Sequence, residues 1–165
     1  MDGSRSVSLG GLDVVFRVSG EETGGVLAVV EHPIEPGVLV PPHVHEREDE
    51  LTYVVEGEIG ARVGEEELPS LGAGQYLWKP RGVPHAFWNA SGAPARILDV
   101  IIPAGFERFF LELGDLIERG ADDREIDEAG RRYGHTIVPD WIPALEERYG
   151  VRPRGSAQVR VDPSR

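Results

Sequence analysis

The chain of 165 residues contains no cysteine, and this absence removes two kinds of chemistry. A protein without cysteine forms no disulfide bond, and its metal sites contain no thiolate ligand. Basic residues are also scarce: 17 Lys and Arg stand against 29 Asp and Glu, which gives a formal charge of −12. This charge repels nucleic-acid phosphates and anionic membrane surfaces. We therefore expect neither nucleic acid nor membrane among the partners.

Long hydrophobic runs are missing as well. No apolar segment approaches the roughly 18 residues that a membrane-spanning helix needs, and residues 1–8 lack the apolar stretch of a secretory signal. The length suits one domain, since single domains typically have about 100–200 residues. With 40% hydrophobic residues the chain can build a core of its own. We predict a single-domain cytoplasmic protein.

Short apolar runs bounded by Gly, Pro, Asn or Ser fill the first two thirds of the chain. They follow an alternating segment that begins near Leu12, and they lie at 38–40, 51–55, 58–63, 75–79, 85–89 and 95–102. Many short strands separated by turns are typical of an antiparallel sandwich or barrel. We expect this β-domain to cover residues 9–103.

The hydrophobic period changes after Pro103, which predicts three helices within residues 104–150. The first carries an apolar stripe of Phe106, Phe109, Phe110, Leu113 and Ile117. The second is capped by Asp122 or Asp123 and ends near Gly134, and the third begins at Asp140 and carries Trp141, Leu145 and Tyr149. We expect these helices to pack on the barrel and residues 151–165 to form a flexible tail.

Three histidines and one glutamate are spaced as ligands of a metal ion. His43 and His45 are two residues apart, so on an extended strand both side chains point to the same face. Glu50 begins the next β-rich run and His85 begins a later one, so a closed sheet could bring all four into one lumen. Imidazole nitrogens with one carboxylate oxygen suit iron, manganese, nickel, cobalt or zinc. We predict a divalent transition metal bound by these four residues.

The same residues belong to two longer motifs that resemble the signature motifs of the cupin family at every defining position. The first contains Gly37, His43, His45, Glu50 and Gly57, and the second contains Gly74, Pro80, Gly82, His85 and Asn89. The resemblance covers the middle of the chain. It implies a mainly β protein whose antiparallel barrel, a double-stranded β-helix or jelly roll, holds the metal in its lumen. The predicted helices follow this barrel.

Aromatic residues near the motifs are candidates for substrate binding. Alternation from His85 places Phe87 on the ligand face, so we expect Phe87 in the pocket wall. Tyr53 and Trp78 are further candidates, although bulges decide which face they occupy and core packing is an equal alternative. No Arg or Lys is tied to the lumen by its spacing, which disfavours a phosphorylated sugar as substrate. His32 and His135 lie outside both motifs, and we expect them to be structural.

The resemblance is to single-domain cupins of the quercetin-dioxygenase-like kind. It implies a metal-dependent dioxygenase that acts on a small aromatic or enolisable substrate, in which Glu50 holds the metal and also accepts the substrate proton. One alternative is a metal-dependent isomerase or lyase that polarises a carbonyl without oxygen. Another is a non-enzymatic cupin that binds a small ligand. Oxygen uptake during turnover separates the first hypothesis from the others.

The apolar stripes of the first and third helices also bear on assembly. A small barrel has limited outer surface on which to bury both stripes, so we predict a homodimer that shares its N-terminal strands or its C-terminal helices. In the competing account the helices fold back on their own sheet.

Overall fold

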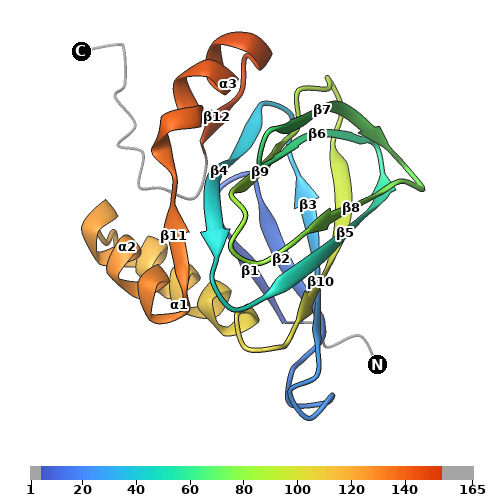
Figure 1. Cartoon of the computed structure of the whole chain (residues 1–165). Helices are drawn as coiled ribbons and strands as arrows, with labels where there is room; N and C mark the ends of the chain where they lie inside the picture. Colours follow the sequence, from blue (N-terminus) through green and yellow to red (C-terminus); the bar gives the residue numbers. More distant parts are fainter. Residues whose placement is uncertain (1–4, 154–165) are drawn as a thin grey trace.

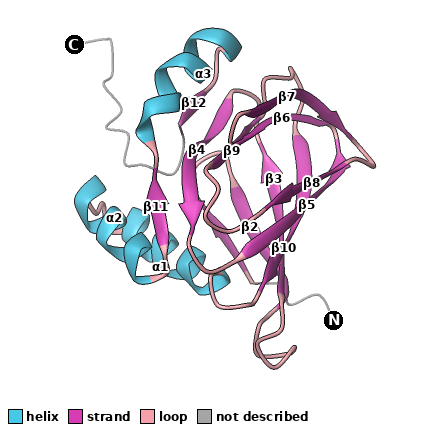
Figure 2. Ribbon diagram, in the orientation of Figure 1, coloured by secondary structure: helices cyan, strands magenta, loops and turns pink. Residues whose placement is uncertain are grey.

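The computed structural model describes residues 5–153, which form two sheets that face each other (Figures 1 and 2). The first sheet has the strand order β1-β2-β3-β10-β5-β8 and is antiparallel throughout. Its strands are β1 (Ser6–Ser8), β2 (Asp13–Val18), β3 (Ala28–Ile34), β10 (Ala95–Ile102), β5 (Asp49–Glu56) and β8 (Tyr76–Lys79).

The second sheet has the order β11-β4-β9-β6-β7, and a short strand β12 pairs in parallel with β4. Its strands are β11 (His135–Ile137), β4 (Val38–His45), β9 (His85–Trp88), β6 (Glu58–Val63), β7 (Glu66–Gly72) and β12 (Arg152–Pro153). From β4 onward the chain crosses repeatedly between the sheets, since β4, β6 and β9 lie in one and β5, β8 and β10 in the other. The mainly β, cupin-like architecture predicted from the sequence is therefore present.

The barrel differs from a closed one in one respect. Within the described residues, strand pairing does not join the two sheets into a continuous ring. The reason lies in the crossings, which are made by loops and not by strands that pair with both sheets. The interior lies between the two sheets, and residues of the C-terminal segment also line it.

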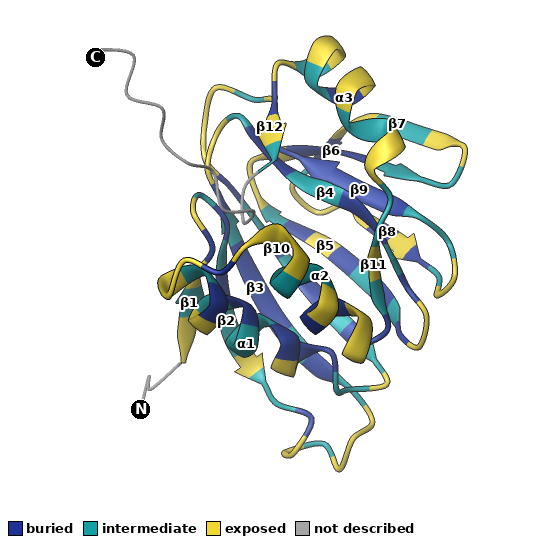
Figure 3. Cartoon of the chain, turned by 90° about the vertical axis from the view of Figure 1, so that its left-hand side faces the viewer, coloured by how far each residue is buried: buried dark blue, intermediate teal, exposed yellow. Residues whose placement is uncertain are grey.

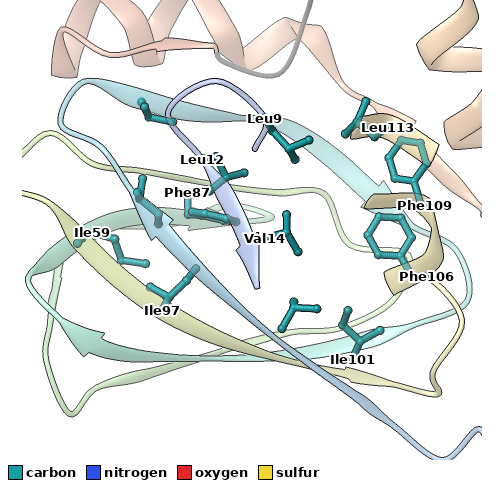
Figure 4. Packing of buried hydrophobic residues seen from close by; sticks show 14 of the residues in the cluster. Leu9, Leu12, Val14, Ile59, Phe87, Ile97, Ile101, Phe106, Phe109 and Leu113 are labelled. Atoms are coloured by element: carbon teal, nitrogen blue, oxygen red, sulfur yellow. The ribbon is translucent and has the colours of Figure 1, made fainter. Parts of the chain in front are cut away.

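Alternation along β10 shows how the sequence builds this interior. Ala95, Ile97, Asp99 and Ile101 are buried, whereas the residues between them are only partly buried. Successive side chains of a strand point to opposite faces, so one face of β10 looks into the space between the sheets. Ile97 and Ile101 belong there to one large apolar cluster (Figure 4). Asp99 is a charged residue in an otherwise apolar row.

The first two helices pack against each other, and the first also contacts β1 while the second contacts β11 (Figure 3). α1 (Glu107–Glu118) follows Phe106, and its buried residues Phe109 and Leu113 join the cluster of the strands, as the apolar stripe predicted (Figure 4). α2 (Asp123–Arg132) starts at a capping box, in which Asp122 and Glu125 each accept a hydrogen bond from the other's backbone N–H. None of the described helices is both long and apolar enough to cross a membrane.

The third helical segment covers the outer face of the second sheet. It consists of a 3-10 turn, η1 (Pro139–Trp141), and α3 (Ile142–Tyr149). Leu145 packs with Trp88 and Val151 in a second, smaller cluster, against which Trp141 and Tyr149 are partly buried. Both apolar stripes are thus covered within one protomer, as the competing account states. Phe110, Ile117, Trp141 and Tyr149 are only partly buried, so the homodimer stays a prediction.

Two segments depart from the expected C-terminal organisation. β11 lies between the second and third predicted helices, where no strand was expected, and pairs residue by residue with the end of β4 from His43 to His45. Val151, the first residue of the predicted flexible tail, is buried, and Arg152 and Pro153 pair with β4. Residues 154–165 lie outside the described residues. The free edge of β4 therefore binds two short strands that have no strong pattern of their own.

Candidate metal centre

The fold brings together the four side chains predicted as metal ligands. His43 and His45 project from the end of β4, Glu50 from β5 and His85 from β9. His43 and His85 are direct partners in the pairing of β4 with β9. All four residues are buried, and one ligand atom from each lies within 4.8 Å of those of the other three.

Backbone carbonyl groups fix the tautomers of two of the rings. Nδ1 of His43 lies 2.7 Å from the carbonyl oxygen of Pro41, and Nδ1 of His85 lies 3.1 Å from that of Val83. A carbonyl oxygen only accepts, so each Nδ1 donates its proton, and Nε2 of the neutral ring keeps a free lone pair. Both rings can therefore offer Nε2 to a metal ion.

Two histidines of this cluster, His43 and His45, are held neutral. Burial lowers the pKa of His45 to about 4, although the carboxylate of Glu50 opposes the shift. Burial, with the neighbouring rings of His85, His135 and His45, lowers the pKa of His43 well below its ordinary value. A metal binds the unprotonated imidazole, so these rings need not lose a proton at neutral pH before binding.

The donor set fits a divalent transition metal. Nε2 of His85 and Nδ1 of His45 are buried and have no hydrogen-bond partner among the described residues. Two donors about 2.1 Å from one ion lie about 3–4 Å from each other. The Glu50 oxygens lie 3.6 Å from Nε2 of His45 and 3.5 Å from Nε2 of His85, which is within that range. An ion between these groups would satisfy the orphaned nitrogen of His85.

A buried lysine contacts the carboxylate of this cluster. Lys79 stands opposite Glu50 in the pairing of β5 with β8 and is 1% exposed. Its Nζ lies 2.7 Å from Oε2 of Glu50 and 3.2 Å from Oδ1 of Asp99, and the hydroxyl of Thr52 donates to the same oxygen of Asp99. The spacing of the basic residues did not indicate this cation in the lumen. The sequence does contain an indication of this residue, because Lys79 is the single lysine of the chain and directly precedes Pro80 of the second motif.

These contacts fix the charges of the ion pair. Burial alone would raise the pKa of Glu50, but Lys79, His45 and His85 outweigh it and hold this pKa well below its ordinary value. Burial likewise opposes the charge of Lys79, but Asp99 and Glu50 raise its pKa. Glu50 is thus an anion held by a fixed cation, which suits a metal ligand and makes it a weak proton acceptor.

A cavity of about 340 Å³ lies beside the four candidate ligands. Its wall includes the rings of Phe87, Phe106, Phe109 and Phe110, of which the first three are labelled in Figure 4. Phe87 comes from β9, on the face predicted by alternation from His85, and the other three come from α1 or the residue before it. The helical segment therefore completes the cavity that the sheets leave open.

Tyr53 and Trp78 do not line this cavity, contrary to their prediction as substrate contacts. They are 44% and 48% exposed on the outer face of β5 and β8. Their chain neighbours Thr52 and Leu77 are buried, and side chains alternate along a strand, so Tyr53 and Trp78 must point outward.

Two histidines outside the motifs also reach the cavity. His135 on β11 has its ring centroid 4.8 Å from that of His43 and stacks on Phe106, and burial lowers its pKa to about 3. His32 on β3 lines the same cavity. No motif indicated either position, because the strand pairing that places them joins distant parts of the chain. All five histidines of the protein thus lie in the wall of the cavity or in the cluster beside it.

Comparison with known proteins agrees with this geometry. The family model described as "Cupin domain" matches residues 31–101, the range that contains all four candidate ligands. Tetracenomycin polyketide synthase protein TcmJ of Streptomyces glaucescens is 35% identical over 81 residues, which are 49% of this chain and 52% of that protein. The matched region thus spans about half the length of this curated relative.

Two solved structures have the same fold. An RmlC-like cupin from Shewanella frigidimarina superposes with a TM-score of 0.54 and 22% identity, over 65% of this chain and 90% of its own. KdgF from Halomonas sp. superposes with a TM-score of 0.53 and 21% identity, over 59% of this chain and 85% of its own. At such identities the likeness shows the shared architecture.

Proposed function

We propose, from the premise that residues 31–101 place this chain in the cupin family, that the protein is a metal-dependent enzyme acting on a small aromatic or enolisable substrate. The leading reaction class is dioxygenation. One observation carries the proposal: a single cavity is lined by four phenylalanine rings and by three of the four candidate metal ligands, and the fourth, His85, lies beside those three. Flat apolar walls suit a planar ligand, and a few polar groups at one end fix its orientation.

The charges of the cavity narrow the substrate class. Lys79 is already paired with two carboxylates, so it offers no free cation to a phosphate or sulfate group. The likeness to TcmJ, which is named as part of a polyketide synthase, points to phenols and enolisable ketones. We therefore favour an uncharged or weakly acidic substrate that binds the metal through an oxygen atom.

The residues divide into ligands and walls. His43, His45, Glu50 and His85 would hold the ion, which when bound supplies a Lewis acid for a substrate oxygen and, if redox-active, an electron partner for dioxygen. We assign Glu50 the ligand role alone. Its low pKa and its ion pair with Lys79 weigh against the proton-accepting role expected from the sequence. The phenylalanines orient the substrate and exclude water.

Two broader predictions accompany this assignment. We propose that residues 9–103 and 104–150 act as one unit, because Phe106, Phe109 and Phe110 of the second range complete the cavity of the first. A cytoplasmic location stays a prediction from the sequence.

The test combines metal analysis with oxygen uptake. The protein is purified without added metal, its metal content is measured, and an oxygen electrode follows a screen of phenols and diketones. We expect iron, nickel or manganese together with oxygen consumption, loss of both in His85→Ala, and retention of both in the matched surface variant Tyr53→Phe. Substrate turnover without oxygen consumption would assign the isomerase or lyase class instead. Metal or ligand binding without turnover would indicate a binding protein.

A further inference from the structure

His32 is a buried titratable residue to which the metal centre gives no role. It occupies an inward position on β3, in a row with Ala28, Val30 and Ile34, and is 2% exposed. Its ring lies in the cavity wall, with its centroid 5.4 Å from that of Phe110 and 6.5 Å from that of Phe87. A polar ring in an apolar row costs stability unless its nitrogens are satisfied.

One nitrogen of His32 is satisfied and fixes the tautomer. Nδ1 lies 3.0 Å from the carbonyl oxygen of Asp13 on β2, so Nδ1 carries the proton and donates it. Burial lowers the pKa of His32, although Asp99 opposes the shift. At neutral pH the ring is therefore neutral, and the lone pair is on Nε2.

The other nitrogen faces a fixed carboxylate. Nε2 lies 3.6 Å from Oδ2 of Asp99, which is too long for a hydrogen bond. Both atoms are acceptors while the ring is neutral, so their contact is unfavourable. Asp99 cannot turn away freely, because its Oδ1 accepts from Thr52 and from Lys79. A proton that arrives at Nε2 converts this contact into an ion pair, and an opposite charge at this range favours the protonated ring.

We propose that His32, positioned by Asp99 and Asp13, accepts a proton from a hydroxyl group of the substrate. This inference rests on the proposed function, since it supplies a base in place of Glu50, whose ion pair with Lys79 makes it a weak proton acceptor. In the step, the substrate O–H bond breaks and its electron pair stays on the oxygen. The proton forms an N–H bond at Nε2, and no oxidant or reductant is needed. The new imidazolium faces Asp99 on β10, with Lys79 on β8 and Glu50 on β5 as the other charged groups that act on it.

The test observes the ring directly by nitrogen-15 NMR of histidine-labelled protein. The chain has five histidines, so the spectrum is simple, and His32→Gln identifies the His32 signals by their loss. Should this variant not fold, His135→Gln identifies the His135 signals, the single variants His43→Ala, His45→Ala and His85→Ala identify those of the three ligand histidines, and the remaining signals belong to His32. The probe is a dihydroxynaphthalene with one hydroxyl on each ring, added at pH 7 to the zinc-loaded and to the metal-free protein.

We expect His32 to have a protonated Nδ1 and an Nε2 without a hydrogen-bond donor before the probe is added. Once the probe is bound, Nε2 should accept a hydrogen bond from its hydroxyl group in the metal-free protein and carry its proton in the zinc-loaded protein, because zinc makes the hydroxyl group more acidic. Asp99→Asn should lower the proton affinity of Nε2 by about tenfold or more, because it removes the opposite charge. A bound probe that leaves the Nε2 signal of His32 unchanged, as a purely structural histidine would, overturns the proposal. A doubly protonated ring before the probe is added overturns it too.

The same spectra separate this proposal from the proposed function. Zinc should shift the signals of His43, His45 and His85. If zinc leaves them unchanged, the metal function fails, while the response of His32 to the probe in the metal-free protein still decides its own role.

Discussion

Replacing Lys79 by methionine tests whether this buried cation balances the charge of the interior. The change keeps an unbranched side chain and removes the ammonium that contacts Glu50 at 2.7 Å and Asp99 at 3.2 Å. Both carboxylates are buried, so neither can recover its charge stabilisation from water. Loss of one partner of a buried ion pair typically costs about 3–5 kcal/mol. We expect a loss of that size in the free energy of unfolding of the metal-free protein.

Metal should reduce this loss. In Lys79→Met a divalent ion becomes the cation nearest to Glu50, and the ammonium no longer competes with it for the carboxylate. Zinc at a hundredfold excess over its Kd adds about 2.7 kcal/mol to any folded protein that binds it. The variant should bind zinc more tightly than the wild type, so the difference in stability between the two proteins should shrink when zinc is added.

Urea unfolding at pH 7, followed by circular dichroism with zinc or with a chelator, measures both effects. Arg81→Met is the matched control. Arg81 lies two residues after Lys79 in the chain, and it forms an exposed ion pair with Asp49. Exposed pairs contribute about 0–1 kcal/mol. If Lys79→Met costs no more than Arg81→Met without metal, or if zinc leaves the difference unchanged, the charge balance inferred for this site is incorrect.

Further predictions concern the ligands, acid and assembly. His43→Ala and His85→Ala should greatly weaken zinc binding in calorimetric titrations while the fold persists; stoichiometric zinc at wild-type affinity would contradict the ligand assignment. Glu50→Gln keeps a carbonyl oxygen but loses the charge, so its zinc affinity should be reduced yet measurable. The stability of the metal-free protein should fall as the pH drops from about 6.5 toward 4. Burial lowers the pKa of His45 to about 4 and that of His135 to about 3, so in this pH range the unfolded chain binds protons at these histidines and the folded protein does not. The penalty for His45 approaches about 3 kcal/mol at the acid end, and an unchanged urea midpoint between pH 7 and pH 5 would exclude it. We still expect a homodimer, now through the exposed aromatic side chains of β5 and β8, and light scattering that gives one chain mass of 18.1 kDa would refute it.

Local chain geometry explains which parts of the site could be predicted. His43 and His45 share a face because strand side chains alternate, and Phe87 follows His85 on one face for the same reason. The stripe of α1 and the capping box of α2 depend on residues three or four apart. Each of these features is determined within a single element, so the sequence contains the information needed.

Features that depend on pairing between elements were not predictable in this way. Tyr53 and Trp78 were assigned to the pocket, but only the packing of β5 and β8 decides which face of each strand is inside. A register shift between Val40 and His43, where β4 pairs with β9, changes the alternation within one strand. The position of His135 beside His43 depends on β11, a strand of three residues with no clear apolar pattern.

Lys79 shows that amino-acid composition can indicate a buried charged residue that the hydrophobic period of a strand does not reveal. It is the single lysine among 17 basic residues, so arginine provides almost all of the positive charge of this protein. An exposed cation can be either residue, but a cation enclosed between Glu50 and Asp99 has to be small. The ammonium is a compact charge whose donors reach both carboxylates, whereas the planar guanidinium needs more room and a different arrangement of acceptors. Lys79→Arg should therefore disturb the site despite keeping the charge, and a lone lysine next to a metal motif is a reason to look for a buried carboxylate pair.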